Sequence, residues 1–268
     1  MIINTMTVVD IHTHLYHKPD LSVEASLSSH DVESIASSYV ERIQSGPADH
    51  AVAIIMDEEF LADEGARSDL LTVRDNSDIF SLAFLIDPLA NDAPEYVDQV
   101  TEAGGVAIKL HPYIQELTPE TYPSVARTMR TVEEHDLITI IDCSYGGEHM
   151  NRANGVHLGH RLAQVVDSPI LLAHGGGPRI LDAVSSADAF SNVYLDTSFS
   201  LQYWDQSSVI ADYAFGYRKL GADRWMWGSD RPYVEQSTSF NRASEFLDEH
   251  GLSNKEQFFG KTATNLLQ

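Results

Sequence analysis

Cysteine is nearly absent from this chain of 268 residues, since Cys143 is the single one and no intramolecular disulfide can form. That composition is typical of a reducing compartment. The N-terminus lacks the basic segment and cleavage motif of a secretion signal, so we expect a cytoplasmic protein. No apolar run approaches the roughly 18 residues that span a membrane, and a membrane partner is not expected. A chain of this length can bury a large core without a disulfide or a structural metal.

Basic residues are also scarce: 17 lysines and arginines stand against 40 aspartates and glutamates, a formal net charge of -23. Without a basic face to meet phosphates, nucleic acid is excluded as an expected partner. Self-repulsion on this scale destabilises a compact fold in dilute buffer, and about 1 M salt screens it within about 3 Å. Two explanations stay open. We favour a halophilic source with a saline cell interior over an ordinary acidic enzyme.

What the chain does contain is a series of short, nearly continuous apolar runs, as expected of parallel strands buried on both faces. Eight such runs are predicted strands: residues 7–14, 50–57, 79–87, 106–112, 137–144, 169–176, 193–198 and 224–230. Helical patterns separate them, and Thr118-Pro119-Glu120 has the sequence of a helix start. Strict alternation predicts an α/β fold, a (β/α)8 TIM barrel, with residues 1–268 as one domain.

Titratable side chains collect where these strands end, which is the catalytic face of such a barrel. His12 and His14 lie two residues apart on the first strand, so both imidazoles face the same side and can reach one metal ion. A lone H-x-H pattern is weak evidence for a metal. Here it is matched by histidines and acids at later strand ends, which strengthens the prediction.

These motifs resemble the amidohydrolase-2 branch of the amidohydrolase superfamily, which holds hydrolases, lactonases and non-oxidative decarboxylases. The matching pieces are DIHTH, IKLHP, ILLAHGGG and WGSDRP, in the family's order and over nearly the whole chain. The ending FFGKTATNLL matches only loosely. The resemblance implies a metal-dependent hydrolase barrel acting on a small-molecule substrate. Barrels of this kind commonly pair, so a homodimer is compatible with it.

Carried over to this chain, the resemblance makes His12 and His14 metal ligands and Asp230 both a ligand and the proton acceptor. His174 becomes the group that polarises the substrate or moves protons. The chain departs from the family on the fifth strand, where Asp142 replaces a metal-binding histidine. A carboxylate there can still bind one divalent ion, zinc or alternatively manganese. It can equally signal that metal binding has weakened or been lost.

Three further residues are candidates for substrate binding. Lys109 and His111 share a face by the same two-residue spacing, and Arg231 follows Asp230. Lys109 could neutralise a substrate carboxylate, act as a carbamylated ligand as in a minority of relatives, or pair with barrel acids. Asp196 and Ser198 are candidates for supporting the metal ligands or, equally, for capping the turn that follows.

Hydrolysis of an amide or lactone bond is the function we expect from these residues. Non-oxidative decarboxylation of an aromatic or unsaturated acid, a metal-free lactonase and a non-enzymatic binding barrel are the alternatives. The segment 145–160, rich in glycine, asparagine and histidine, is either a lid over the site or a plain surface loop.

Overall fold

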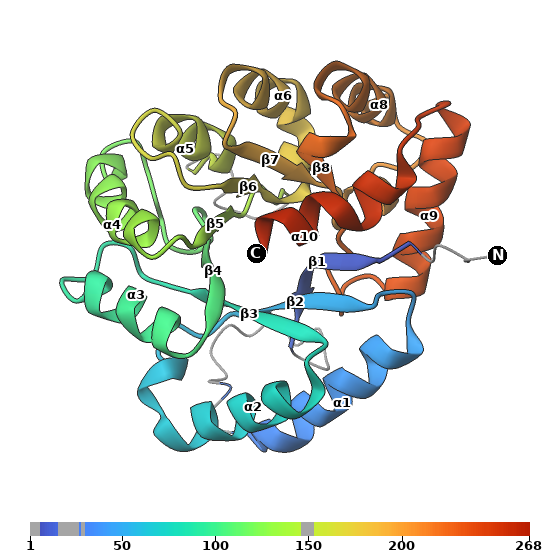
Figure 1. Ribbon diagram of the computed structural model, residues 1–268. Helices are drawn as coiled ribbons and strands as arrows, with labels where there is room; N and C mark the ends of the chain where they lie inside the picture. The colour runs from blue at the N-terminus through green and yellow to red at the C-terminus, as the bar shows by residue number, and fades with distance from the viewer. Residues whose placement is uncertain (1–5, 16–26, 28–29, 146–152) are drawn as a thin grey trace.

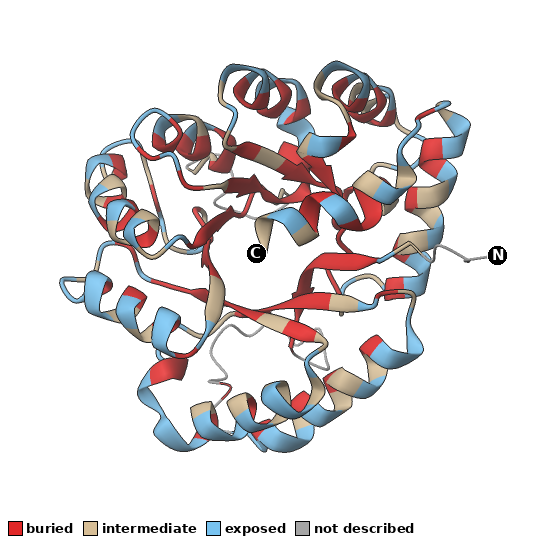
Figure 2. Ribbon diagram, in the orientation of Figure 1, coloured by how far each residue is buried: buried red, intermediate tan, exposed pale blue. Residues whose placement is uncertain are grey.

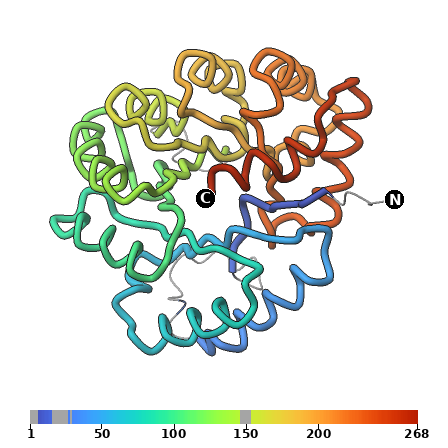
Figure 3. Tube along the Cα trace, in the orientation of Figure 1, coloured from blue at the N-terminus to red at the C-terminus, as the bar shows by residue number. Residues whose placement is uncertain are grey.

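The computed structural model describes residues 6–15, 27, 30–145 and 153–268. Eight parallel strands follow one another around a ring in chain order, as the colour sequence of the tube in Figure 3 shows. The strands are β1 (Val9–His14), β2 (His50–Ile55), β3 (Phe80–Leu85), β4 (Gly105–Leu110), β5 (Ile138–Ile141), β6 (Ile170–Leu172), β7 (Val193–Asp196) and β8 (Trp225–Met226). The predicted (β/α)8 barrel is confirmed.

Helices surround this ring on the outside, except the last one, α10, which lies across one opening of the barrel (Figure 1). They are α1 (Val32–Ser45), α2 (Glu64–Ser77), α3 (Ala93–Glu102), α4 (Tyr122–Glu134), α5 (Gly155–Leu162), α6 (Ile180–Ala189), α7 (Ser200–Tyr203), α8 (Val209–Leu220), α9 (Gln236–Glu249) and α10 (Thr262–Leu266). Short 3-10 helices cover Phe60–Ala62 and Ala222–Arg224, and a π-helix covers Gln257–Lys261. The segment Ala173–Arg179 after β6 is tightly turned, with non-helical backbone angles from His174 to Gly177. None of the helices in the described part of the chain is long and apolar enough to cross a membrane.

Hydrogen bonds between the first and last strands complete the ring. Ile11 N donates to Trp227 O at 3.2 Å, and His14 N donates to Arg231 O at 2.7 Å. Between them, Asp230 N donates to His12 O at 2.8 Å. This closure brings the end of β1 directly beside the segment that follows β8, so His12, His14 and Asp230 meet although they are far apart in sequence.

The apolar core has two parts, because strands buried on both faces pack inward and outward (Figure 2). The inner cluster fills the barrel with side chains such as Ile11, Ile54, Ile140 and Leu171. Ala263 of α10 belongs to it, and α10 crosses one opening of the barrel in Figure 1. The outer cluster lies between strands and helices. With one opening filled in this way, the polar strand ends are left for chemistry at the other.

Two local predictions are wrong. Thr118, Pro119 and Glu120 do not begin a helix, because Thr121 N closes a turn onto Thr118 O at 2.9 Å and α4 starts after it. The Thr118 hydroxyl donates to Glu120 instead of capping. Part of segment 145–160 is helix α5, capped by Asn154, and not a loop. Residues 146–152 of that segment lie outside the described residues.

Candidate active site

The first strand delivers two imidazoles to the same point. His14 Nε2 lies 3.2 Å from Asp230 Oδ1, and His12 Nε2 lies 3.5 Å from the same oxygen. His12 is fully buried, while 7% of His14 and of Asp230 is exposed. Gly228 permits this approach, since a Cβ there would lie 2.8 Å from His12 Cβ. The predicted juxtaposition of the three side chains therefore appears in the structure.

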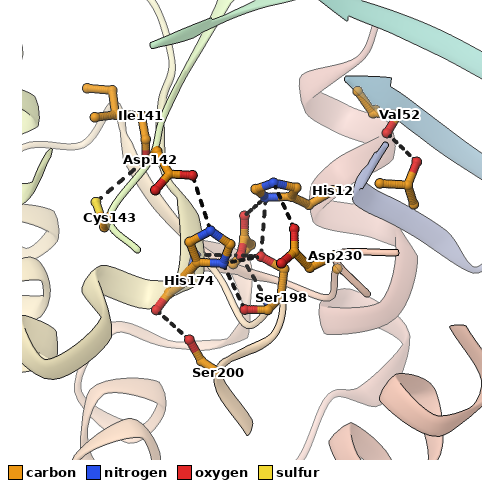
Figure 4. A network of polar contacts seen from close by, with 12 residues as sticks. His12, Val52, Ile141, Asp142, Cys143, His174, Ser198, Ser200 and Asp230 are labelled. Atoms are coloured by element: carbon orange, nitrogen blue, oxygen red, sulfur yellow. Dashed lines mark hydrogen bonds and ion pairs between the residues drawn. The ribbon is translucent and has the colours of Figure 1, made fainter. Parts of the chain in front are cut away.

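His12 is fixed in one tautomer by the groups around it (Figure 4). Its Nδ1 lies 3.1 Å from Asp196 Oδ2, and because a carboxylate only accepts, Nδ1 carries the proton. Nε2 then presents a lone pair toward Asp230. Burial first, and the Lys109 charge second, lower the pKa of His12 to about 4, so the ring is neutral at pH 7. A neutral imidazole oriented by a carboxylate is the usual form of a metal-binding histidine.

Asp196 and Ser198 contact His12 and His174 and also stabilise the turn after β7. Asp196 Oδ1 accepts from His174 N and from Ser198 N, each at 2.9 Å. The Ser198 hydroxyl donates to Asp196 and lies 3.0 Å from His174 Nδ1. Supporting the ligands and capping the turn were alternatives for these two residues, and the contacts include both.

His174 is held as an imidazolium between two acceptors. Its Nδ1 lies 3.0 Å from the carbonyl oxygen of Ser198, and its Nε2 lies 3.3 Å from Asp142 Oδ2. Neither partner atom can donate, so both ring nitrogens carry protons. Burial opposes the charge, but Asp142 prevails and raises the pKa of His174 to about 9. The site thus contains a fixed, buried positive group.

Asp142 faces Lys109 and not the three-residue cluster of β1 and β8. Lys109 Nζ lies 3.0 Å from Asp142 Oδ2, with the lysine side chain fully buried. Burial would raise the pKa of Asp142, but His111, Lys109 and His174 together hold it well below its ordinary value. Three roles were considered for Lys109, and the structure contains the contact of one of them, the ion pair with a barrel acid.

Lys109 also reaches the first strand, because its Nζ lies 3.4 Å from His12 Nε2. An ammonium can donate there, so it competes for the lone pair that a metal would use. Across the site, Asp230 keeps its negative charge: burial opposes ionisation, but a hydrogen bond from His14 and the positive charge of His174 lower its pKa strongly.

The other two residues predicted to bind substrate, His111 and Arg231, differ in their surroundings. His111 is buried, with Nε2 3.5 Å from Asp142 Oδ2, and burial lowers its pKa to about 4. Arg231 is buried as well, and its charge, after burial, lowers the pKa of Arg42 on α1. The charge of Arg231 therefore acts on α1, whereas His111 remains within the site.

Strained backbone marks the site. His174, Phe199 and Asp230 all have φ near +60°, a conformation that costs bulky side chains energy and is concentrated at functional sites. The Phe199 ring centroid lies 6.4 Å from those of His174 and Tyr145. The Tyr233 ring stands edge-on to His14 at 5.8 Å. We did not predict these aromatic neighbours, since nothing in a lone Phe or Tyr after a strand distinguishes it from packing.

The donor atoms of β1 and β8 fit a divalent ion. His12, His14 and Asp230 form a group whose ligand atoms lie within 4.8 Å of one another, and His12, His174 and Asp196 form a second. The separations of 3.2 and 3.5 Å from Asp230 Oδ1 are close to about 3.4 Å, the edge of a tetrahedron centred about 2.1 Å from each ligand. Asp142 belongs to neither group among the described residues.

The Amidohydrolase family model matches residues 9–268, nearly the whole chain. None of the curated proteins matches. Among solved structures, a probable 2-pyrone-4,6-dicarboxylic acid hydrolase from Acinetobacter baumannii, with citric acid bound, has 15% identity and a TM-score of 0.68. The alignment covers 98% of this chain and 99% of that one. Identity this low shows the shared fold alone.

Two other solved structures extend the range of chemistry on the same fold. An amidohydrolase from Burkholderia multivorans with bound zinc has 14% identity and a TM-score of 0.67, over 97% of this chain and 99% of that one. A 5-carboxyvanillate decarboxylase from Sphingomonas paucimobilis has 12% identity and a TM-score of 0.65, over 98% and 99%. Hydrolysis and decarboxylation thus both occur on barrels of this shape.

Proposed function

The chain belongs to the amidohydrolase family of enzymes, and from that premise we propose that it hydrolyses an amide or lactone bond of a small molecule. The observation that carries this proposal is the cluster of His12, His14 and Asp230 beside the imidazolium of His174. It combines a carboxylate able to accept a proton with a fixed positive group near it. Water addition to a carbonyl requires both.

We propose His12, His14 and Asp230 as the residues that hold one divalent ion, zinc first and manganese as the alternative. When bound, such an ion supplies Lewis acidity that lowers the pKa of water and polarises a carbonyl. Asp196 contributes by keeping the Nδ1 proton of His12 in place, which leaves Nε2 free to bind. Asp142 was expected as a further ligand; its pairing with Lys109 supports an electrostatic role instead.

In the proposed reaction Asp230 transfers the proton, and His174 stabilises the negative charge that develops. Asp230, ionised at neutral pH, accepts the proton of the attacking water at its carboxylate and returns it to the leaving group. His174 is positively charged and stabilises the oxyanion that develops on the attacked carbonyl. Asp142 keeps that charge on His174 through the contact at 3.3 Å.

A metal-free lactonase is the second candidate, and one contact favours it. The Lys109 ammonium, 3.4 Å from His12 Nε2, already places a positive charge where a metal would act. Activity that survives exhaustive chelation is the expected result for this candidate. Loss of activity on chelation and recovery on adding zinc or manganese is expected for the first.

The test is a panel of lactones, amides and aromatic acids, with products identified by mass spectrometry and carbon dioxide measured. Hydrolysis predicts uptake of water, and Asp230→Asn should lower kcat by roughly 10²–10⁴-fold because it removes the proton acceptor. Asp10→Asn is the matched control, since Asp10 is a buried carboxylate of the same barrel that contacts Ser229 and Gln236. Carbon dioxide without water uptake would establish decarboxylation instead. Full hydrolysis by Asp230→Asn would refute the assigned role.

A further inference from the structure

A cavity of about 370 Å³ opens between the ends of β4, β5 and β6, next to the proposed catalytic residues. Asp142 lines it, and this carboxylate contacts Lys109. It also contacts His174, as Figure 4 shows. The volume falls within the range of about 300–1,000 Å³ of small-molecule sites. A molecule that fills this cavity therefore extends away from the reacting bond while staying in reach of the site.

Arg179 is the only positively charged side chain among the described residues that line the cavity. It precedes α6, and among the described residues its guanidinium pairs only with Asp182, at 3.8 Å, a contact between two exposed groups. Exposed pairs of that kind contribute little and are readily exchanged. The guanidinium is thus available to a ligand, with the planar geometry that binds carboxylates at two points.

Neutral hydrogen-bond donors line the same cavity. The Ser144 hydroxyl, beside the Tyr113 hydroxyl, is buried and has no hydrogen-bond partner of normal geometry among the residues that the structure describes. Gly155 and Val156 begin α5 on another wall, where the first backbone amides of a helix lack partners within it. Gly155 is needed there because a Cβ would lie 2.1 Å from Asp142 O.

Charge explains why such a subsite needs its own arginine. The chain has a net charge of -23, which repels anions at long range. Lys109, which the sequence suggested as a residue that binds a substrate carboxylate, is fully buried and forms an ion pair with Asp142 at 3.0 Å. The other suggested anchor, Arg231, is buried as well. Neither of them lines the cavity.

We propose that this cavity binds a carboxylate of the substrate through Arg179, and that Arg179 is a specificity-determining residue. The proposal rests on the proposed function in assigning the ligand as substrate. It narrows the substrate class to small acids whose carboxylate lies away from the bond that reacts. It requires no change in the roles of His12, His14, His174 or Asp230.

The test measures binding without turnover, so it stays informative even if no hydrolysis is found. Phthalate, a planar dianion, is titrated into the wild-type protein by calorimetry, with uncharged dimethyl phthalate as the ligand control. Arg179→Gln should weaken phthalate binding roughly tenfold, and Arg179→Lys should retain part of the affinity. Arg218→Gln removes the same charge from an exposed position on α8 and should leave the affinity unchanged.

Three results would overturn the proposal. Equal affinity of Arg179→Gln and wild type would show that the guanidinium does not bind the anion. Equal loss in Arg179→Gln and Arg218→Gln would assign the effect to net charge. Absence of saturable phthalate binding to the wild-type protein at millimolar concentrations would show that the cavity does not hold a dianion.

Discussion

Replacing Lys109 by methionine removes the positive partner of a buried ion pair and should destabilise the fold. Lys109 Nζ lies 3.0 Å from Asp142 Oδ2, with the two side chains 0% and 6% exposed. Truncating one member of a buried pair costs about 3–5 kcal/mol, because the other charge stays buried. His174 remains 3.3 Å from Asp142, so we expect the lower end, about 3 kcal/mol.

The partner variant makes the prediction sharper. Asp142→Asn alone leaves the Lys109 ammonium beside His12 without its counter-ion, and we again expect a loss of about 3 kcal/mol. The double variant Lys109→Met/Asp142→Asn buries no charge from this pair. Because His174 still loses its contact with Asp142, the double variant should lose about 3 kcal/mol. Simple addition predicts about 6 kcal/mol, so the coupling is about 3 kcal/mol.

Urea unfolding at constant salt gives the free energy of unfolding for all four proteins. The exposed pair of Lys219 and Asp188, at 2.9 Å, is the matched control, and the cycle of Lys219→Met with Asp188→Asn should show coupling below about 1 kcal/mol. Additive effects of Lys109→Met and Asp142→Asn, within about 0.5 kcal/mol, would refute the reasoning.

Three further predictions concern pH and salt. Burial raises the pKa of Asp10 to about 6, so its carboxyl group favours the folded state below about pH 4 and loses that contribution as the pH rises through 6. At pH 7, the free energy of unfolding of Asp10→Asn, measured with urea, should therefore exceed that of the wild-type protein by up to about 3 kcal/mol. This difference should vanish near pH 4, and a difference that does not change with pH would contradict the prediction. Because Asp142 raises the pKa of His174 to about 9, kcat/KM should fall as the pH rises through 9, and a flat profile up to pH 10 would remove His174 from the mechanism. With a net charge of -23, the melting temperature should rise between about 0.1 M and about 1 M potassium chloride; no change would favour an ordinary acidic enzyme over a halophilic one.

The barrel could be predicted because each strand is a short apolar run. Such a run can be recognised in the sequence without knowing the tertiary contacts of the strand. Ile138–Ile141 and Ile170–Leu172 are examples. Helix starts were harder to predict, since they depend on competing hydrogen bonds. The turn from Thr118 to Thr121 is closed by backbone and hydroxyl hydrogen bonds between these two residues, which the sequence does not reveal. Similarly, α5 depends on the cap from Asn154 within a polar, glycine-rich segment.

The site could be predicted in part for the same reason. His12 and His14 share a face by the geometry of a strand, and Asp230 follows from barrel closure. The partner of Asp142 could not be chosen from sequence, because Lys109 on β4 and His174 after β6 both lie at the ends of strands that neighbour β5. The burial of Arg231 depends on the packing around it, and the availability of Arg179 depends on the walls of a cavity built from three loops.

Metal content tests the central claim of a divalent ion on His12, His14 and Asp230 most directly. The protein should be purified in high salt without chelator or nickel resin, and bound metal measured by mass spectrometry. We predict about one zinc or manganese per chain, absent from His12→Ala/His14→Ala and retained in His135→Ala/His250→Ala, which removes two histidines elsewhere. No metal in the wild-type protein, even after soaking with zinc or manganese, would contradict this site and favour the metal-free lactonase.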